Sequence, residues 1–192
     1  MPITLNGSGT VSGISVGGLP DGIIQSADLA TGTGGKILQV VSTTKTDTAS
    51  FSSVNTNNFT DISGLSVSIT PSSTSNKILV VATVAAAVGT GSLHVRLARG
   101  STGIAVGDSS SNRQSSTMSR RTQSSIYNLE ITPMSFNFLD SPNTTSATTY
   151  KVQATAGSTY DTTVYVNRSS GDNDYSYGAR VASTITVMEV AA

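Results

Sequence analysis

Apolar and polar residues alternate along most of the chain after Lys36. In Ile62–Thr70, for example, leucine, valine and isoleucine alternate with serine, which is the pattern of a half-buried β-strand. The same reasoning, with turn-forming residues as boundaries, predicts nine strands: Lys36–Ser42, Ile62–Thr70, Lys77–Val88, Leu93–Arg99, Ser125–Ile131, Met134–Asp140, Thr148–Ala156, Thr162–Arg168 and Ser183–Val190. Apart from a single turn at Ser26–Ala30, no useful window has a helical period. Short strands at this spacing predict an all-β fold, an antiparallel sandwich or jelly roll.

The predicted strand Lys77–Val88 is apolar on both faces, whereas an outer sandwich strand should be polar on one side. Either the chain's own loops or a second subunit must cover its second face. We favour a subunit interface, because small residues in the latter half of the strand suit close approach of another chain. The candidate interface residues are Leu79, Val81, Thr83, Ala85 and Ala87.

Composition narrows the classes of partner. Charged residues make up 11% of the 192 residues and the net charge is zero, so we expect no binding to nucleic acid. Serine and threonine make up roughly a third of the chain, which suits strands and turns. The longest apolar run, Ile78–Val88, is too short to cross a bilayer, so we expect no membrane insertion.

Catalytic motifs are weak, and we expect no enzyme, cofactor or metal. Gly13–Gly17 matches the G-x-S-x-G pattern around Ser15, but no helix follows, and the one histidine, His94, lies in a predicted strand. Ala30–Ile37 lacks the first glycine and the magnesium-binding hydroxyl of a phosphate loop. There is no cysteine, and both glutamates lie in predicted strands. Asp172–Asp174 offers too few oxygen ligands for a full calcium cage.

Two long polar stretches, Ser109–Ser125 and Arg168–Arg180, hold five of the seven arginines. Arginine offers planar donors to carboxylates, and tyrosine offers a ring on which a sugar can stack. Solvated loops are the plainer interpretation. The candidates for contact with a surface ligand are Arg113, Arg120, Arg121, Arg168, Tyr175 and Tyr177.

Several phrases of the sequence resemble segments of a known class of protein. "GTGGKILQVVSTTKTDT", "FTDISGLSVSITPSSTSNKILV", "FLDSPNTTSATTYKVQ" and the closing "STITVMEVAA" resemble the C-terminal ends of tail-fibre and other virion proteins of bacteriophages, marine and cyanobacterial ones especially. The opening, with "GGLPDG" and "ADLA", also resembles phage-fibre segments. The resemblance implies a homotrimeric jelly-roll head of the tumour-necrosis-factor and complement-C1q type on the virion surface. Its implied task is host attachment as a fibre head. The alternative is a capsid decoration, cement or head-fibre protein that stabilises the shell.

The resemblance also implies a role for the first 35 residues. Residues 1–35 are predicted to be an extended arm that docks on another virion protein or a partner subunit, and residues 36–192 the head. The alternative is a flexible linker. Glycines let the backbone of such an arm lie close to its partner. The candidate docking residues are Val11, Ile14, Val16, Leu19, Ile23 and Ile24.

Overall fold

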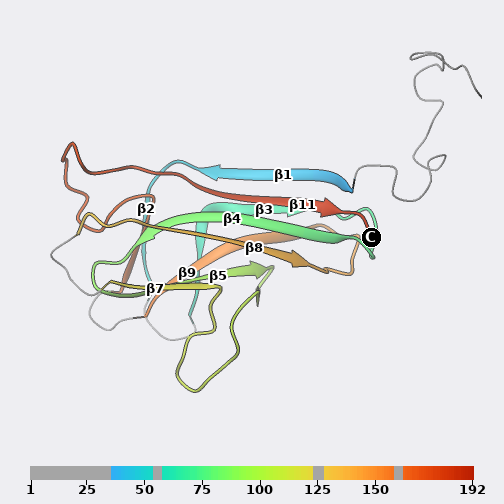
Figure 1. Ribbon diagram of the computed structural model, residues 1–192, viewed down its shortest axis with the longest axis horizontal. Coiled ribbons are helices and arrows are strands. Elements are labelled where there is room, and N and C mark those ends of the chain that lie inside the picture. The colour runs from blue at the N-terminus through green and yellow to red at the C-terminus, as the bar shows by residue number, and fades with distance from the viewer. Residues whose placement is uncertain (1–35, 54–57, 123–127, 158–161) are drawn as a thin grey trace, which may run out of the picture. The chain divides into compact units, whose positions relative to one another are not determined.

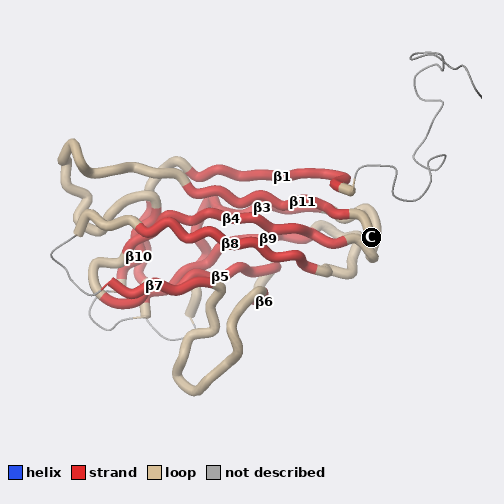
Figure 2. The backbone as a smooth tube through the Cα atoms, in the orientation of Figure 1, coloured by secondary structure: helices blue, strands red, loops and turns tan. Residues whose placement is uncertain are grey.

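The computed structural model describes residues 36–53, 58–122, 128–157 and 162–192, and in these ranges all the regular structure is β (Figures 1 and 2). The strands are β1 (Ile37–Lys45), β2 (Ala49–Ser52), β3 (Thr60–Ile69), β4 (Lys77–Ala87), β5 (Gly91–Arg99), β6 (Thr102–Ile104), β7 (Met118–Thr122), β8 (Thr132–Asp140), β9 (Thr148–Ala156), β10 (Thr163–Val166) and β11 (Ser183–Val190). No helix in the described ranges is long and apolar enough to span a membrane.

The strands form two antiparallel sheets that pack as a sandwich. In the six-stranded sheet the order is β1-β11-β4-β10-β2, with β8 paired to the other edge of β4. In the five-stranded sheet the order is β3-β9-β5-β6, with β7 also paired to β5. From β3 onward the chain passes repeatedly between the sheets, and β1-β11-β4-β8 faces β3-β9-β5-β7. This strand order is that of a jelly roll and confirms the predicted all-β sandwich.

The core follows from the alternation of each strand. Ile185 and Val187 of β11 lie opposite Ala82 and Val80 of β4, and all four side chains are buried. The facing sheet contributes residues such as Leu97 of β5 to the same hydrophobic cluster. Each fully buried aliphatic side chain of this kind stabilises the fold by about 1.5–3 kcal/mol relative to exposure.

Eight of the nine predicted strands are present, with ends shifted by a few residues. The ninth, Ser125–Ile131, is wrong where it can be tested, because Asn128 and Leu129 form a turn. The alternation also missed β2, β6 and β7. The last of these, "MSRRT", lies within a stretch that was expected to be a loop, since its polar residues show no apolar face. The expected arm, residues 1–35, lies outside the described residues.

The two ends of the sandwich differ, and we call the end where β1 begins the proximal end and the end where β1 stops the distal end (Figure 1). At the proximal end, Ile37 at the start of β1 pairs with Val190 near the C-terminus, and the 70–76 turn lies beside them. At the distal end, Lys45 pairs with Ser183, and β10 pairs with the last residues of β4. The connection between β10 and β11, residues 167–182, lies at this distal end. It is the red segment on the left of Figure 1.

Candidate functional site

The connection 167–182, called the distal loop below, is anchored by Asn167. This residue is fully buried, and its φ of 60° is in the left-handed region that asparagine tolerates better than most residues. Its amide nitrogen donates hydrogen bonds of 2.9 Å to the carbonyl oxygens of Lys45 and Asp47. Its Oδ1 accepts a 2.6 Å bond from the Ser183 hydroxyl. Asn167 therefore fastens the loop to β1 and β11.

Two exposed tyrosines, Tyr175 and Tyr177, lie on the distal loop. The rings of Tyr175 and Tyr177 stack with centroids 5.0 Å apart and an interplanar angle of 18°. Tyr175 is 50% exposed and Tyr177 is 71% exposed, although large aromatic surfaces are usually buried. A stacked pair left in solvent offers a flat apolar face for a sugar ring or a partner side chain.

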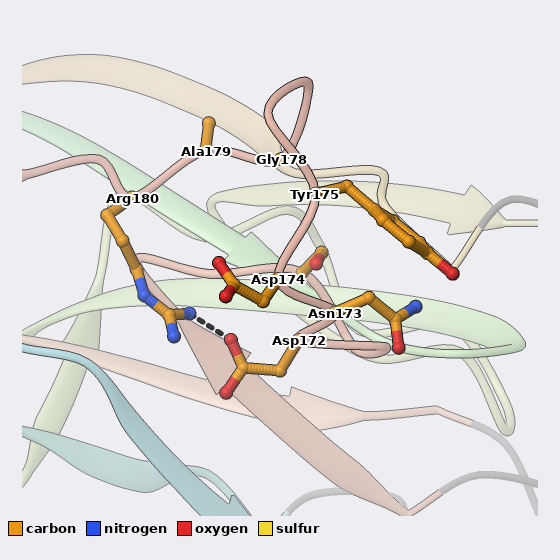
Figure 3. Close-up of a pocket in the computed structure, with 8 residues that line it drawn as sticks. Asp172, Asn173, Asp174, Tyr175, Gly178, Ala179 and Arg180 are labelled. Carbon is orange, nitrogen blue, oxygen red and sulfur yellow. Dashed lines mark hydrogen bonds and ion pairs between the residues drawn. The ribbon is translucent and has the colours of Figure 1, made fainter.

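A polar pocket lies beside this pair. It measures about 260 Å³ and is lined by Ser169, Asp172, Asn173, Asp174, Tyr175, Gly178, Ala179 and Arg180. Figure 3 shows Arg180 and Tyr175 on opposite sides, with the two aspartates between them. Arg180 is hydrogen-bonded to Asp172, and this bond, together with the charges of Arg168 and Arg180, holds the pKa of Asp172 below its usual value. With its arginine already paired, the pocket suits a neutral, hydroxyl-rich ligand better than an anion.

The distal loop meets the turn before β8. The Gly171 amide donates a 2.8 Å hydrogen bond to the Asn128 carbonyl oxygen, and the Ser170 hydroxyl donates to the same oxygen. A Cβ at Gly171 would lie 2.4 Å from Cγ of Asn128, so a larger residue here would force the Asn128 side chain to move. The second polar stretch singled out in the sequence is thus joined to the turn at Asn128, within the segment wrongly predicted as a strand, and the sequence did not reveal this contact.

The arginine candidates differ in their surroundings. Arg120 lies in β7 and forms an ion pair with Glu130, and it also donates to the Thr132 hydroxyl at 2.6 Å. Arg168 is largely buried, since its guanidinium lies 4.6 Å from the Tyr165 ring centre and 3.5 Å from an Asp172 oxygen. Arg113 and Arg121 are exposed. Of the four candidates, these last two are the ones with a cation open to a ligand.

The interface candidates on β4 also divide into two groups. Ala85 and Ala87 are buried within the single chain, at 4% and 5% exposure, so they have little surface left for a partner. Val81 is 39% exposed, and Leu79 and Thr83 are partly exposed. The chain's own structure therefore covers the distal part of this face and leaves the proximal part open.

The open part belongs to a larger surface, the outer face of β1, β11, β4 and β8. Strand register aligns four apolar residues across it, namely Val40, Met188, Leu79 and Leu139. Two further rows carry mainly hydroxyl groups, with Ser42 bonded to Thr186 and Thr83 bonded to Ser135. Val40 is 56% exposed and Leu139 is 47% exposed. Sequence analysis found the β4 part of this face, but only strand order shows that four strands share it.

The remaining candidates are placed as follows. Ser15 and the six docking candidates from Val11 to Ile24 lie outside the described residues. His94 lies in β5, opposite Ser119 of β7 and Thr155 of β9. Within the described ranges, no three His, Cys, Asp or Glu side chains are grouped as metal ligands. Asp172 is instead paired with two arginines.

No protein-family model matches the chain, and the search of curated proteins finds no match.

Proposed function

We propose that this chain is a bacteriophage virion surface protein, a trimeric and non-enzymatic β head that contacts the host cell. The observation that carries the proposal is the difference between the two ends of the head. The strand that follows residues 1–35 begins at the proximal end, whereas the exposed Tyr175–Tyr177 pair and its polar pocket lie on the distal loop. Such an arrangement suits a protein held at one end that presents a binding surface at the other. The sequence resemblance to virion appendages supports the same function.

The outer face of β1, β11, β4 and β8 supports the trimeric state in this proposal. On its distal side the apolar row from Val40 to Leu139 is followed by two rows that hold Val81 among serine, threonine and asparagine, and the charged Lys77 lies at the proximal edge. Apolar centres that lack charge are typical of the buried core of subunit interfaces. A single chain leaves this row in water, and two further copies would cover it.

Immunogold labelling of intact phage particles tests the location of the protein. Antibodies against the head should label a fibre or spike tip, and free head protein should compete with phage for adsorption to host cells. Labelling spread over the capsid, with particles that lose heat resistance when the protein is absent, would instead support the capsid-decoration function. Labelling of neither structure would reject the virion proposal.

A further inference from the structure

A second pocket, of about 360 Å³, lies on the outer face of the five-stranded sheet, away from the tyrosine pair. His94 of β5, Ser119 of β7 and Gly157 after β9 line it from the sheet. The long connection between β6 and β7 lines it from above, through Asn112, Arg113, Gln114 and Ser116. Apart from Gly157, the lining residues have polar side chains, with amides, hydroxyls, one imidazole and one guanidinium, although carbon atoms form much of the pocket surface.

The imidazole of His94 has unused hydrogen-bonding capacity. Its Nδ1 is buried and has no hydrogen-bond partner in the described part of the chain, whereas buried polar atoms are usually hydrogen-bonded. Burial also lowers the pKa of His94, so the ring is neutral at pH 7 and carries one donor and one acceptor. A Cβ at Gly157 would lie 2.4 Å from Nε2, so the ring occupies space that only glycine leaves open.

Arg113 supplies a cation at the same pocket. It is held in a tight turn, with its amide bonded to the Ser110 carbonyl oxygen and its guanidinium 3.1 Å from the Ser110 hydroxyl. Arg99, Arg120, Arg168 and Arg180 each pair with a carboxylate, whereas no carboxylate in the described ranges forms an ion pair with Arg113. The pocket therefore has a positive charge that an anionic ligand can neutralise.

We propose that this pocket binds one sugar residue that carries a carboxylate, as in an acidic polysaccharide. A guanidinium pairs with a carboxylate through two parallel hydrogen bonds, while the serine hydroxyls and side-chain amides suit sugar hydroxyls. The volume lies in the range of small-ligand sites. This site goes beyond the tyrosine-lined pocket, whose arginine is already paired, and its binding can be measured without knowing where the protein lies on a virion.

The single histidine makes a direct test possible. The imidazole C2 proton of His94 gives one histidine signal in the NMR spectrum of the full chain, and titration with glucuronate should shift it saturably. Glucose should bind at least tenfold more weakly, because it lacks the carboxylate. Arg113→Gln should weaken glucuronate binding at least tenfold, and Lys77→Gln, which removes an exposed cation at the start of β4 in the other sheet, should leave it unchanged.

Two further probes separate a sugar site from a simple anion site. Gly157→Ala should weaken glucuronate binding, because the new methyl group displaces the His94 ring. Inorganic phosphate should bind more weakly than glucuronate. The proposal is overturned if glucuronate causes no saturable shift, if Arg113→Gln binds as tightly as the unchanged chain, or if phosphate binds as tightly as glucuronate.

Discussion

The Tyr150 hydroxyl of β9 donates a buried 2.6 Å hydrogen bond to Oδ2 of Asp140, at the end of β8. The bond joins one sheet to the other at the proximal end. Arg99 of β5 donates to the same carboxylate at 2.8 Å, so Asp140 receives two partners from the facing sheet. Burial, followed by this hydrogen bond, raises the pKa of Tyr150, so the hydroxyl is protonated and can donate at pH 7.

Tyr150→Phe should destabilise the head by about 1–3 kcal/mol, because it removes a hydrogen bond to a charged group and leaves part of the Asp140 carboxylate unsatisfied. Thermal unfolding at fixed protein concentration measures the effect. Tyr177→Phe is the matched control, since Tyr177 is 71% exposed, and its unfolding temperature should not change. Equal unfolding temperatures for both variants would show that the bond between the sheets contributes nothing to stability.

Glu189 of β11 is a second polar anchor at the proximal end. It is 1% exposed, yet its carboxylate accepts hydrogen bonds from the Gln39 amide, the Ser72 amide and hydroxyl, and the Asn76 amide. Burial opposes ionisation, but these donors outweigh it and lower the pKa of Glu189 to about 2. The carboxylate thus holds the 70–76 turn against β1 and β11.

Because this pKa is lower in the folded state than the ordinary value of 4.5, ionised Glu189 stabilises the fold above pH 4.5. That contribution should disappear as the pH falls from 4.5 to about 2. Glu189→Gln should lower the free energy of unfolding by about 1–3 kcal/mol at pH 7, because the glutamine NH2 group would face the N–H and O–H donors that now bind the carboxylate. The variant should also show a flatter dependence of stability on pH between 4.5 and 2, measured by urea unfolding at several pH values. If stability depends on pH between 4.5 and 2 as steeply in the variant as in the unchanged chain, ionised Glu189 does not stabilise the fold.

The outer face gives a test of assembly. Val81→Arg places a charge in the centre of the proposed interface, and burying it without a partner is costly. Light scattering should therefore show monomers in place of trimers. Val81 is preferable to Ala85, because an arginine at the buried Ala85 would disturb the single chain itself. Ser66→Arg, on the exposed face of β3 in the other sheet, should remain trimeric. A trimeric Val81→Arg variant would place the interface elsewhere.

Alternation predicted strands such as Ile62–Thr70 because one face of each is buried against the facing sheet. It missed β7, whose five residues include Arg120 and Arg121 and are partly or fully exposed. Such a strand is specified by pairing with β5 and leaves no apolar pattern. The arginines were singled out from the sequence, but their surroundings depend on partners that the sequence did not identify. Glu130 pairs with Arg120 across a turn, and the contact of Gly171 with Asn128 joins segments 43 residues apart.

Asn167→Ala tests whether the distal loop acts through its ordered conformation. The change removes the bonds to Lys45, Asp47 and Ser183 and places alanine at a φ of 60°. We expect lower thermal stability and faster proteolysis within 168–182. Asn167→Gly is the control for backbone strain, because it tolerates this φ but loses the same bonds. If both variants resist proteolysis as the unchanged chain does, Asn167 is not the anchor.

The tyrosine pair gives the sharpest test of the proposed host contact. Replacing Tyr175 and Tyr177 by alanine removes the exposed stack but breaks none of the hydrogen bonds that hold the loop at Asn167, so the trimer and its unfolding temperature should not change. Three copies add their weak contacts through avidity, so binding of the head to host cells should fall by tenfold or more. The measurement is the bound fraction of fluorescent head protein on host cells, compared with Ser66→Ala, on the exposed face of β3, as a surface control. Unchanged binding of the double variant, with normal binding by the unchanged head, would remove the tyrosine pair from the recognition surface.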